Sequence, residues 1–123
     1  MANVLVLEEE PSIAGIVSHK LRREGHAVRC EAEVPEARRL LAVWPPDVVL
    51  LDLELDPELA LLSELGARYP VLALTRFQDS KAPRAALEAG AAATMEKPFK
   101  PTVLARVVAQ LAGPGGMAIK QRS

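Results

Sequence analysis

The sequence of 123 residues is poor in the residue types that build disulfide frameworks, multi-cysteine metal sites and aromatic platforms. Cys30 is its only cysteine, so an internal disulfide, a two-cysteine redox centre and a multi-cysteine zinc site are excluded. Because free cysteine is among the most buried residue types, we expect Cys30 to be a packed thiol. Aromatic residues make up 3% of the chain, so aliphatic side chains must supply the core.

An excess of charge of either sign is also missing. The chain has 15 Lys and Arg against 16 Asp and Glu, and its formal net charge is −1 at pH 7. This balance provides no bulk attraction for nucleic acid or for an anionic membrane. The sequence has no apolar run long enough to span a bilayer and no charged leader before an apolar segment. We therefore predict a cytoplasmic protein that binds neither nucleic acid nor membrane directly.

What the sequence does contain is a regular alternation of short apolar runs with amphipathic segments. Continuous apolar runs of this length are typical of strands buried on both faces of a parallel sheet. Such runs occupy residues 4–7, 48–51 and 71–74, and weaker strands are expected at 27–32 and 91–95. The alternation predicts an α/β fold, a doubly wound parallel sheet of five strands. We assign residues 1–112 to one domain and residues 113–123, which begin Gly-Pro-Gly-Gly, to a flexible C-terminal tail or linker.

Helix boundaries follow from capping residues and apolar spacing. The first helix is expected to begin near Pro11 and to turn Ile13, Ile16, Val17 and Leu21 toward the core. For the third helix, Asp56-Pro57-Glu58 forms a favourable start, and the helix is expected to end at Gly66. The remaining three helices are expected around 37–44, over 80–89 and over 101–111.

Polar residues follow the apolar runs at the ends where the strands stop. These residues are Glu8, Glu9, Asp52, Thr75 and Lys97. Right-handed crossovers bring all these strand ends to one rim of the sheet, where the carboxylates repel each other unless a cation lies among them. Hard oxygen ligands suit Mg²⁺, and a hydroxyl with a lysine suits phosphoryl oxygens. A carboxylate at the end of a strand can be a structural cap, but in this setting it can also act as a nucleophile toward phosphorus.

Five motifs in order resemble the receiver domains of bacterial response regulators. They are Leu7-Glu8-Glu9-Glu10-Pro11, Leu50-Leu51-Asp52-Leu53, Leu74-Thr75, Glu88-Ala89-Gly90-Ala91 and Lys97-Pro98-Phe99. The resemblance covers everything before the tail. It implies a flavodoxin-like (βα)5 fold with strand order 2-1-3-4-5, the order that chemotaxis receivers exemplify.

The resemblance also implies roles for individual residues. Asp52 is expected to be the phosphoacceptor, taking a phosphoryl group from a sensor histidine kinase or a phosphotransfer protein. Glu8, Glu9, Asp52 and the backbone carbonyl of Glu54 are expected to bind Mg²⁺. Thr75 is expected to bind a phosphoryl oxygen and Lys97 to pair with the phosphoryl group, next to a Lys97–Pro98 peptide that is cis in the family. The output is expected through the face made by the fourth helix, fifth strand and fifth helix, toward a downstream effector protein, an effector domain or a second copy of the chain.

Several residues depart from the pattern of that family, among them Asp56, Ala60 and Lys100, and three departures bear on the site. The Glu9 position usually holds aspartate, and the longer side chain changes its reach toward Mg²⁺, which demands near-ideal geometry. Arg76 replaces a small residue, and could shield the phosphoryl group from water or occupy the pocket in its absence. Thr94 replaces an aromatic residue that rotates when the switch is thrown.

Two other functions stay open from the sequence. A pseudo-receiver would keep the fold and act as a phosphorylation-independent interaction module, a reading that the departures at Glu9, Arg76 and Thr94 motivate. An aspartyl-phosphate phosphatase would be an enzyme, but that chemistry typically has aspartate two residues after the nucleophile, where Glu54 stands. We predict a signalling domain rather than an enzyme. A flavin or nucleotide site is disfavoured because the loop after the first strand is acidic and lacks glycine.

Overall fold

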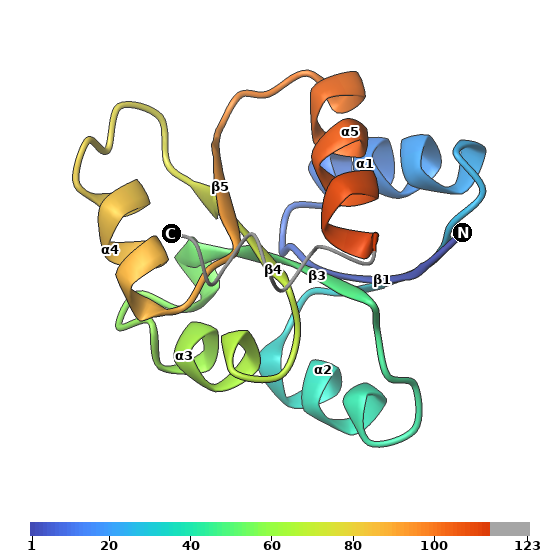
Figure 1. Cartoon of the computed structure of the whole chain (residues 1–123), viewed down its shortest axis with the longest axis horizontal. Helices are drawn as coiled ribbons and strands as arrows, with labels where there is room; N and C mark the ends of the chain where they lie inside the picture. Colours follow the sequence, from blue (N-terminus) through green and yellow to red (C-terminus); the bar gives the residue numbers. More distant parts are fainter. Residues whose placement is uncertain (114–123) are drawn as a thin grey trace.

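A five-stranded parallel sheet lies between two layers of helices in a computed structural model that describes residues 1–113 (Figure 1). The strands pair in the order β2-β1-β3-β4-β5, and every neighbouring pair is parallel. The doubly wound fold and its strand order are therefore confirmed. In chain order the elements are β1 Asn3–Leu7, α1 Pro11–Arg23, β2 Ala27–Glu31, α2 Val34–Leu41, β3 Val48–Asp52, the 3₁₀ turn η1 Leu53–Leu55, α3 Ala60–Gly66, β4 Val71–Thr75, α4 Ala82–Ala89, β5 Ala93–Glu96 and α5 Pro101–Ala112.

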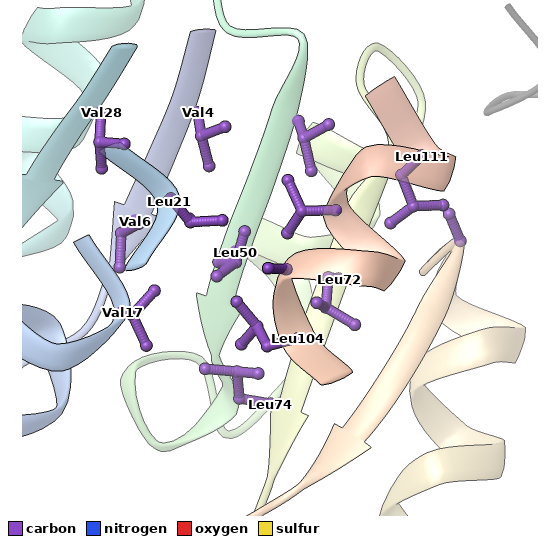
Figure 2. Close-up of a cluster of buried hydrophobic side chains, with 14 residues drawn as sticks. Val4, Val6, Val17, Leu21, Val28, Leu50, Leu72, Leu74, Leu104 and Leu111 are labelled. Carbon is purple, nitrogen blue, oxygen red and sulfur yellow. The ribbon is translucent and has the colours of Figure 1, made fainter. Parts of the chain in front are cut away.

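Two clusters of aliphatic side chains form the core, one on each face of the sheet. Helices α1 and α5 cover the first face, where Leu21 and Leu104 belong to the same cluster as Leu50 and Leu72 (Figure 2). Helices α2, α3 and α4 cover the second face around Leu62. Because successive strand residues point to opposite faces, a strand covered on both sides must be apolar throughout. This is why the continuous apolar runs became the interior strands.

The interior strands and the edge strands differ in burial. All five residues of β3 and of β4 are buried. At one edge, β2 buries Val28 and leaves Arg29 and Cys30 exposed. At the other edge, every residue of β5 keeps some exposure. The interior strands thus contribute fully buried side chains to the core, whereas the two edge strands are partly exposed to solvent.

Helix α3 begins later than the sequence predicted. Its first residue is Ala60, and the preceding residue Leu59 has a left-handed backbone with φ of 60°. Asp56 still caps the helix, because its buried carboxylate accepts hydrogen bonds from the backbone N–H groups of Leu61 at 3.0 Å and Leu62 at 2.7 Å. The prediction of a helix starting at Asp56 was wrong because the chain makes a turn between the capping residue and the helix.

Two burial predictions were also wrong. Cys30 is exposed, since β2 is an edge strand and only β1 pairs with it. Ile16 is 56% exposed, although Val17 and Leu21 on the same helix are fully buried. Residues 17 and 21 lie four positions apart and share one face of α1, whereas residue 16 is rotated about 100° from residue 17.

Smaller differences concern the ends of elements. Helix α4 begins at Ala82 rather than at residue 80, with Pro83 in its first turn, and β5 covers 93–96 rather than 91–95. The Lys97–Pro98 peptide is cis. Of the predicted tail, only Gly113 belongs to the described residues, and positions 114–123 lie outside them. Within residues 1–113, every helix is too short or too polar to cross a membrane.

Candidate functional site

The carboxyl ends of four strands meet at one rim of the sheet and place the predicted residues there. Glu8 directly follows β1, and Asp52 is the last residue of β3. Thr75 ends β4, and Lys97 follows β5, with its backbone N–H donating to the carbonyl of Thr75 at 2.9 Å. Because the pairing is parallel, residues that are far apart in the chain become neighbours at this rim.

Lys97 is the centre of a cluster of acidic side chains. Its Nζ lies 2.9 Å from Oε1 of Glu8 and 3.0 Å from Oδ2 of Asp52. A third carboxylate, that of Glu54, is 4.0 Å away. The ammonium therefore touches acids from the ends of β1 and β3, and it partly neutralises them.

Burial makes this cluster electrostatically costly. Glu8 and Asp52 are 3% and 1% exposed, so their charges have little contact with water. Burial raises the pKa of Glu8, and the adjacent Asp52 raises it further, although contact with Lys97 acts in the opposite direction. Burial tends to lower the pKa of Lys97, but its contacts with Glu8 and Asp52 outweigh that effect and the net pKa is raised. Lys97 is therefore a fixed positive charge at neutral pH.

Hydrogen bonds hold the two buried carboxylates in place. Asp52 accepts from the backbone N–H of Glu54 at 3.1 Å through Oδ1 and from Lys97 through Oδ2. Glu8 accepts from the backbone N–H of Glu10 at 3.2 Å through Oε2. Oε1 of Glu8 is close to Lys97 but is not aligned for a hydrogen bond, and it has no other partner in residues 1–113. This buried oxygen atom can therefore accept a further ligand.

Thr75 lies beside this cluster with its side chain buried. Its hydroxyl makes a long contact of 3.5 Å to the backbone carbonyl of Met95 on β5. A contact of that length is a weak hydrogen bond. The hydroxyl is thus available to a stronger acceptor at the rim.

Comparison with known proteins identifies the fold and the family together. The model of the response regulator receiver domain matches residues 4–109, which is most of the chain. The chain belongs to the response regulator receiver domain family. Domains of this family are regulatory and interact with histidine kinases and effectors, and the family generally uses Mg²⁺ at its phosphorylation site.

Individual relatives agree with that assignment. The transcriptional regulatory protein KdpE of Mycobacterium tuberculosis is 36% identical over 104 residues, a stretch that covers 80% of this chain and 46% of KdpE. The chain thus spans about half the length of the curated relatives that it matches. A putative response regulator from Chloroflexus aurantiacus has a TM-score of 0.82 at 28% identity, with 90% of this chain and 97% of that chain covered. NtrX from Brucella abortus has a TM-score of 0.82 at 30% identity, covering 98% of this chain and 27% of NtrX.

The donor set of this receiver domain fits Mg²⁺ in part. Glu8 and Asp52 provide hard oxygen atoms that converge on Nζ of Lys97, and Oε1 of Glu8 has only this ion pair as a partner within residues 1–113. Glu9 is exposed, and within residues 1–113 it is not among the carboxylates that pair with Lys97. Across the described residues, no group of three His, Cys, Asp or Glu side chains is arranged to hold a metal. The buried carboxylates of Glu8 and Asp52 are therefore the side chains best placed to bind Mg²⁺, and the exposed Glu9 is not adjacent to Lys97 with them.

The carboxylate of Glu54 is a member of the cluster that the sequence reasoning missed, since only the backbone carbonyl was considered. One carboxylate oxygen faces Lys97, and the other lies 3.5 Å from Nη2 of Arg76. The signal was available, because Glu54 follows a strand-end carboxylate by two residues at the same rim. Arg76 does not occupy the pocket, because its side chain is 70% exposed and contacts Glu54.

Two depressions adjoin the receiver site. One, of about 390 Å³, lies between the segments that follow β3 and β4, and Glu54, Thr75, Arg76 and Lys81 are among its lining residues. The other, of about 460 Å³, is mostly apolar, and its lining comprises Ile13, Ile16, Val17, Phe77, Lys97, Pro98, Phe99 and Pro101. Lys97 thus connects the acidic cluster with an apolar groove.

Proposed function

We propose that this receiver domain accepts a phosphoryl group on Asp52 from the phosphohistidine of a sensor histidine kinase or a phosphotransfer protein. The observation that carries the proposal is the contact of one ammonium, that of Lys97, with both buried carboxylates at the rim, Glu8 and Asp52. A structural cap needs only the backbone N–H of Glu54. It needs neither a second buried acid nor a lysine.

In the proposed reaction, an oxygen of the Asp52 carboxylate attacks phosphorus. The phosphorus–nitrogen bond of the phosphohistidine breaks, and its electron pair returns to the imidazole. Lys97 holds the phosphoryl oxygens by charge, and the Thr75 hydroxyl leaves the carbonyl of Met95 to donate to one of them. A carboxylate nucleophile and fixed positive charge are the two elements that such a transfer requires.

The proposed Mg²⁺ ligands are the carboxylates of Glu8 and Asp52 and the backbone carbonyl of Glu54, with Glu9 acting through a water molecule. When bound, Mg²⁺ neutralises negative charge on the transferring phosphoryl group. Oε1 of Glu8, which is buried and accepts no hydrogen bond within residues 1–113 beside its ion pair with Lys97, supports this assignment. The exposure of Glu9 favours an indirect contact over a direct one.

The apolar groove beside Lys97 supports a protein as the phosphodonor. An α-helix laid along Ile16 and Phe99 would bring its phosphohistidine within reach of the acceptor, because Lys97 lines the groove and touches Asp52. We propose the face of α4, β5 and α5 as the output surface for an effector protein, an effector domain or a second copy. All four residues of β5 keep some exposure there, and Leu87 and Val103 are each 38% exposed.

We further propose that residues 1–112 act as the receiver unit and that residues 113–123 form a tail or linker. KdpE, which is about twice as long as the matched segment, is a transcriptional regulatory protein. The receiver unit of this chain would by analogy control an effector, attached or separate, while making no direct contact with nucleic acid itself.

Acetyl phosphate with Mg²⁺ tests the proposal without a kinase. We expect the intact protein to gain the mass of one phosphoryl group and to lose that gain in Asp52→Asn. Asp47→Asn is the matched control, because Asp47 precedes the same strand at its opposite end, where its carboxylate accepts a hydrogen bond from the backbone N–H of Asn3. A mass gain that survives in Asp52→Asn contradicts the assignment.

The same measurement decides between this function and a phosphorylation-independent pseudo-receiver. The position of Glu9 outside the cluster is the observation that favours the alternative. A wild-type protein that gains no mass at any Mg²⁺ concentration, and that binds Mg²⁺ no better than Asp52→Asn does, would be an interaction module of this kind.

A further inference from the structure

The residue that follows Thr75 is a large cation that the proposed transfer does not use. Arg76 leaves the end of β4, and its exposed side chain reaches Glu54, which follows β3. The distance from Nη2 to Oε1 of Glu54 is 3.5 Å. This pair joins the segment that follows β3, the strand that ends in Asp52, to the segment that follows β4.

Glu54 links the guanidinium to the phosphoacceptor. Its backbone N–H donates to Oδ1 of Asp52 at 3.1 Å, so its position relative to the acceptor is fixed. Its second carboxylate oxygen lies 4.0 Å from Nζ of Lys97, which itself contacts Asp52. A single residue, Glu54, therefore contacts both Arg76, through its carboxylate, and Asp52, through its backbone N–H.

The pair between Arg76 and Glu54 is easily exchanged. Both side chains are solvent-exposed, 70% and 43%, and ion pairs in such surroundings are weak. A phosphoryl group on Asp52 would repel the Glu54 carboxylate, and it offers oxygen atoms that match the planar guanidinium fork. A dianion next to the acceptor is thus a better partner for Arg76 than Glu54 is.

Space for Arg76 to move exists next to the residues that flank the acceptor, although Asp52 itself is buried and does not line it. Glu54, Thr75 and Arg76 all line the depression of about 390 Å³. Lys97 is already shared by Glu8 and Asp52, so a second cation can serve the additional charge of a phosphoryl group.

We propose that Arg76 is a phosphoryl-binding residue of this domain, whose guanidinium leaves Glu54 and binds an oxygen of the phosphoryl group on Asp52. The inference rests on the proposed function. No covalent bond changes in this step, since one ion pair and its hydrogen bonds are replaced by another.

Beryllofluoride, formed from beryllium and fluoride salts in the presence of Mg²⁺, is the probe, and its affinity is measured by fluorine NMR at fixed Mg²⁺. We expect Arg76→Ala to bind it about tenfold more weakly than wild type, in keeping with the loss of a charge-assisted contact. Arg76→Lys, which keeps the charge and loses the fork, should fall between the two. Glu54→Gln should bind about threefold more tightly, because it releases Arg76 and removes a repelling charge.

Arg84→Ala is the matched control, since Arg84 is an exposed arginine that pairs with Glu88 on α4. It should bind beryllofluoride as wild type does, and all variants should unfold at the wild-type temperature. Unchanged or tighter binding in Arg76→Ala overturns the role of Arg76 while leaving Asp52 as the acceptor. Failure of the wild type to bind the probe overturns the proposed function, and the role of Arg76 with it.

Discussion

Strands β3 and β5 belong to the same sheet but differ in burial and in the number of strands that pair with them. All five residues of β3 are buried, with a strand on each side, whereas β5 pairs only with β4 and has no buried residue. Yet each delivers one member of the central ion pair, Asp52 at the end of β3 and Lys97 just after β5. The comparison teaches that burial of the β3 side chains fixes the position of Asp52. Backbone pairing with β4, by contrast, holds β5 and so positions its counter-ion, Lys97.

The largest effect should come from removing core volume in β3. Leu50→Ala deletes a fully buried side chain and should lower the free energy of unfolding by about 4 kcal/mol. Met95→Ala, on β5, is the matched change at a partly buried position and should cost about 1 kcal/mol. Urea denaturation measures both. Equal losses would contradict the contrast between the two strands.

The second test concerns the backbone contact that precedes β5. A Cβ atom at Gly66 on α3 would lie 2.6 Å from the carbonyl oxygen of Gly90, which ends α4. Because backbone cannot move aside easily, Gly66→Ala should cost about 3 kcal/mol. Gly15→Ala on α1 is the control, since nothing lies within 4 Å of its added methyl group, and it should stabilise by about 0.5 kcal/mol. A neutral Gly66→Ala would show that β5 does not depend on this close approach.

The third test separates Lys97 from the strand that carries it. Lys97→Met leaves Glu8 and Asp52 buried without their cation and should cost about 2 kcal/mol at pH 7. Lys100→Met, an exposed lysine in the same loop, should be neutral. We expect Mg²⁺ to restore part of the loss in Lys97→Met, as measured by thermal unfolding with and without the ion. A variant that unfolds at the wild-type temperature without Mg²⁺ would show that the buried acids need no cation.

The smallest effect is expected at the opposite edge of the sheet, before β2. Nδ1 of His26 accepts a hydrogen bond from the backbone N–H of Ala2 at 3.1 Å. Burial lowers the pKa of His26, and the positive charge of the amino terminus adds to this effect. A base with a lowered pKa in the folded state stabilises the fold above its ordinary pKa, and this contribution is lost as the pH falls.

We therefore expect the wild type to lose about 0.5 kcal/mol relative to His26→Asn as the pH falls below about 6.5. The asparagine oxygen can accept the same hydrogen bond at every pH. Parallel stability curves for the two proteins between pH 7 and 5 would contradict this role of His26.

The sequence allowed the interior of the fold to be predicted better than its edges. The apolar run ending in Asp52 predicts a strand covered on both faces, because only there are all its apolar side chains removed from water. The structure confirms this prediction. By contrast, β5 was inferred from the alternation of elements and lies two residues from its predicted start. Cys30 was placed inside because cysteine usually is, but strand order decides burial, and its position at an edge is set by long-range pairing.

The same distinction applies to the candidate site. The ends of the predicted strands indicated that Glu8, Asp52 and Lys97 lie close together, because backbone pairing fixes where strands stop. They did not place the side chains of Glu9, Glu54 and Arg76, which lie in the short turns and loops that follow the strands. Their directions depend on local turns and on each other's charge, neither of which has a periodic signal in sequence.

The contact between Lys97 and the acids has a consequence for synthesis on the ribosome. Glu8 and Asp52 emerge early, whereas their cation lies 45 residues after Asp52. A nascent chain that has paired only β1 to β4 would bury two carboxylates with nothing to neutralise them, which opposes premature compaction. The lysine thus favours closing the centre of the sheet only after its last strand has been made.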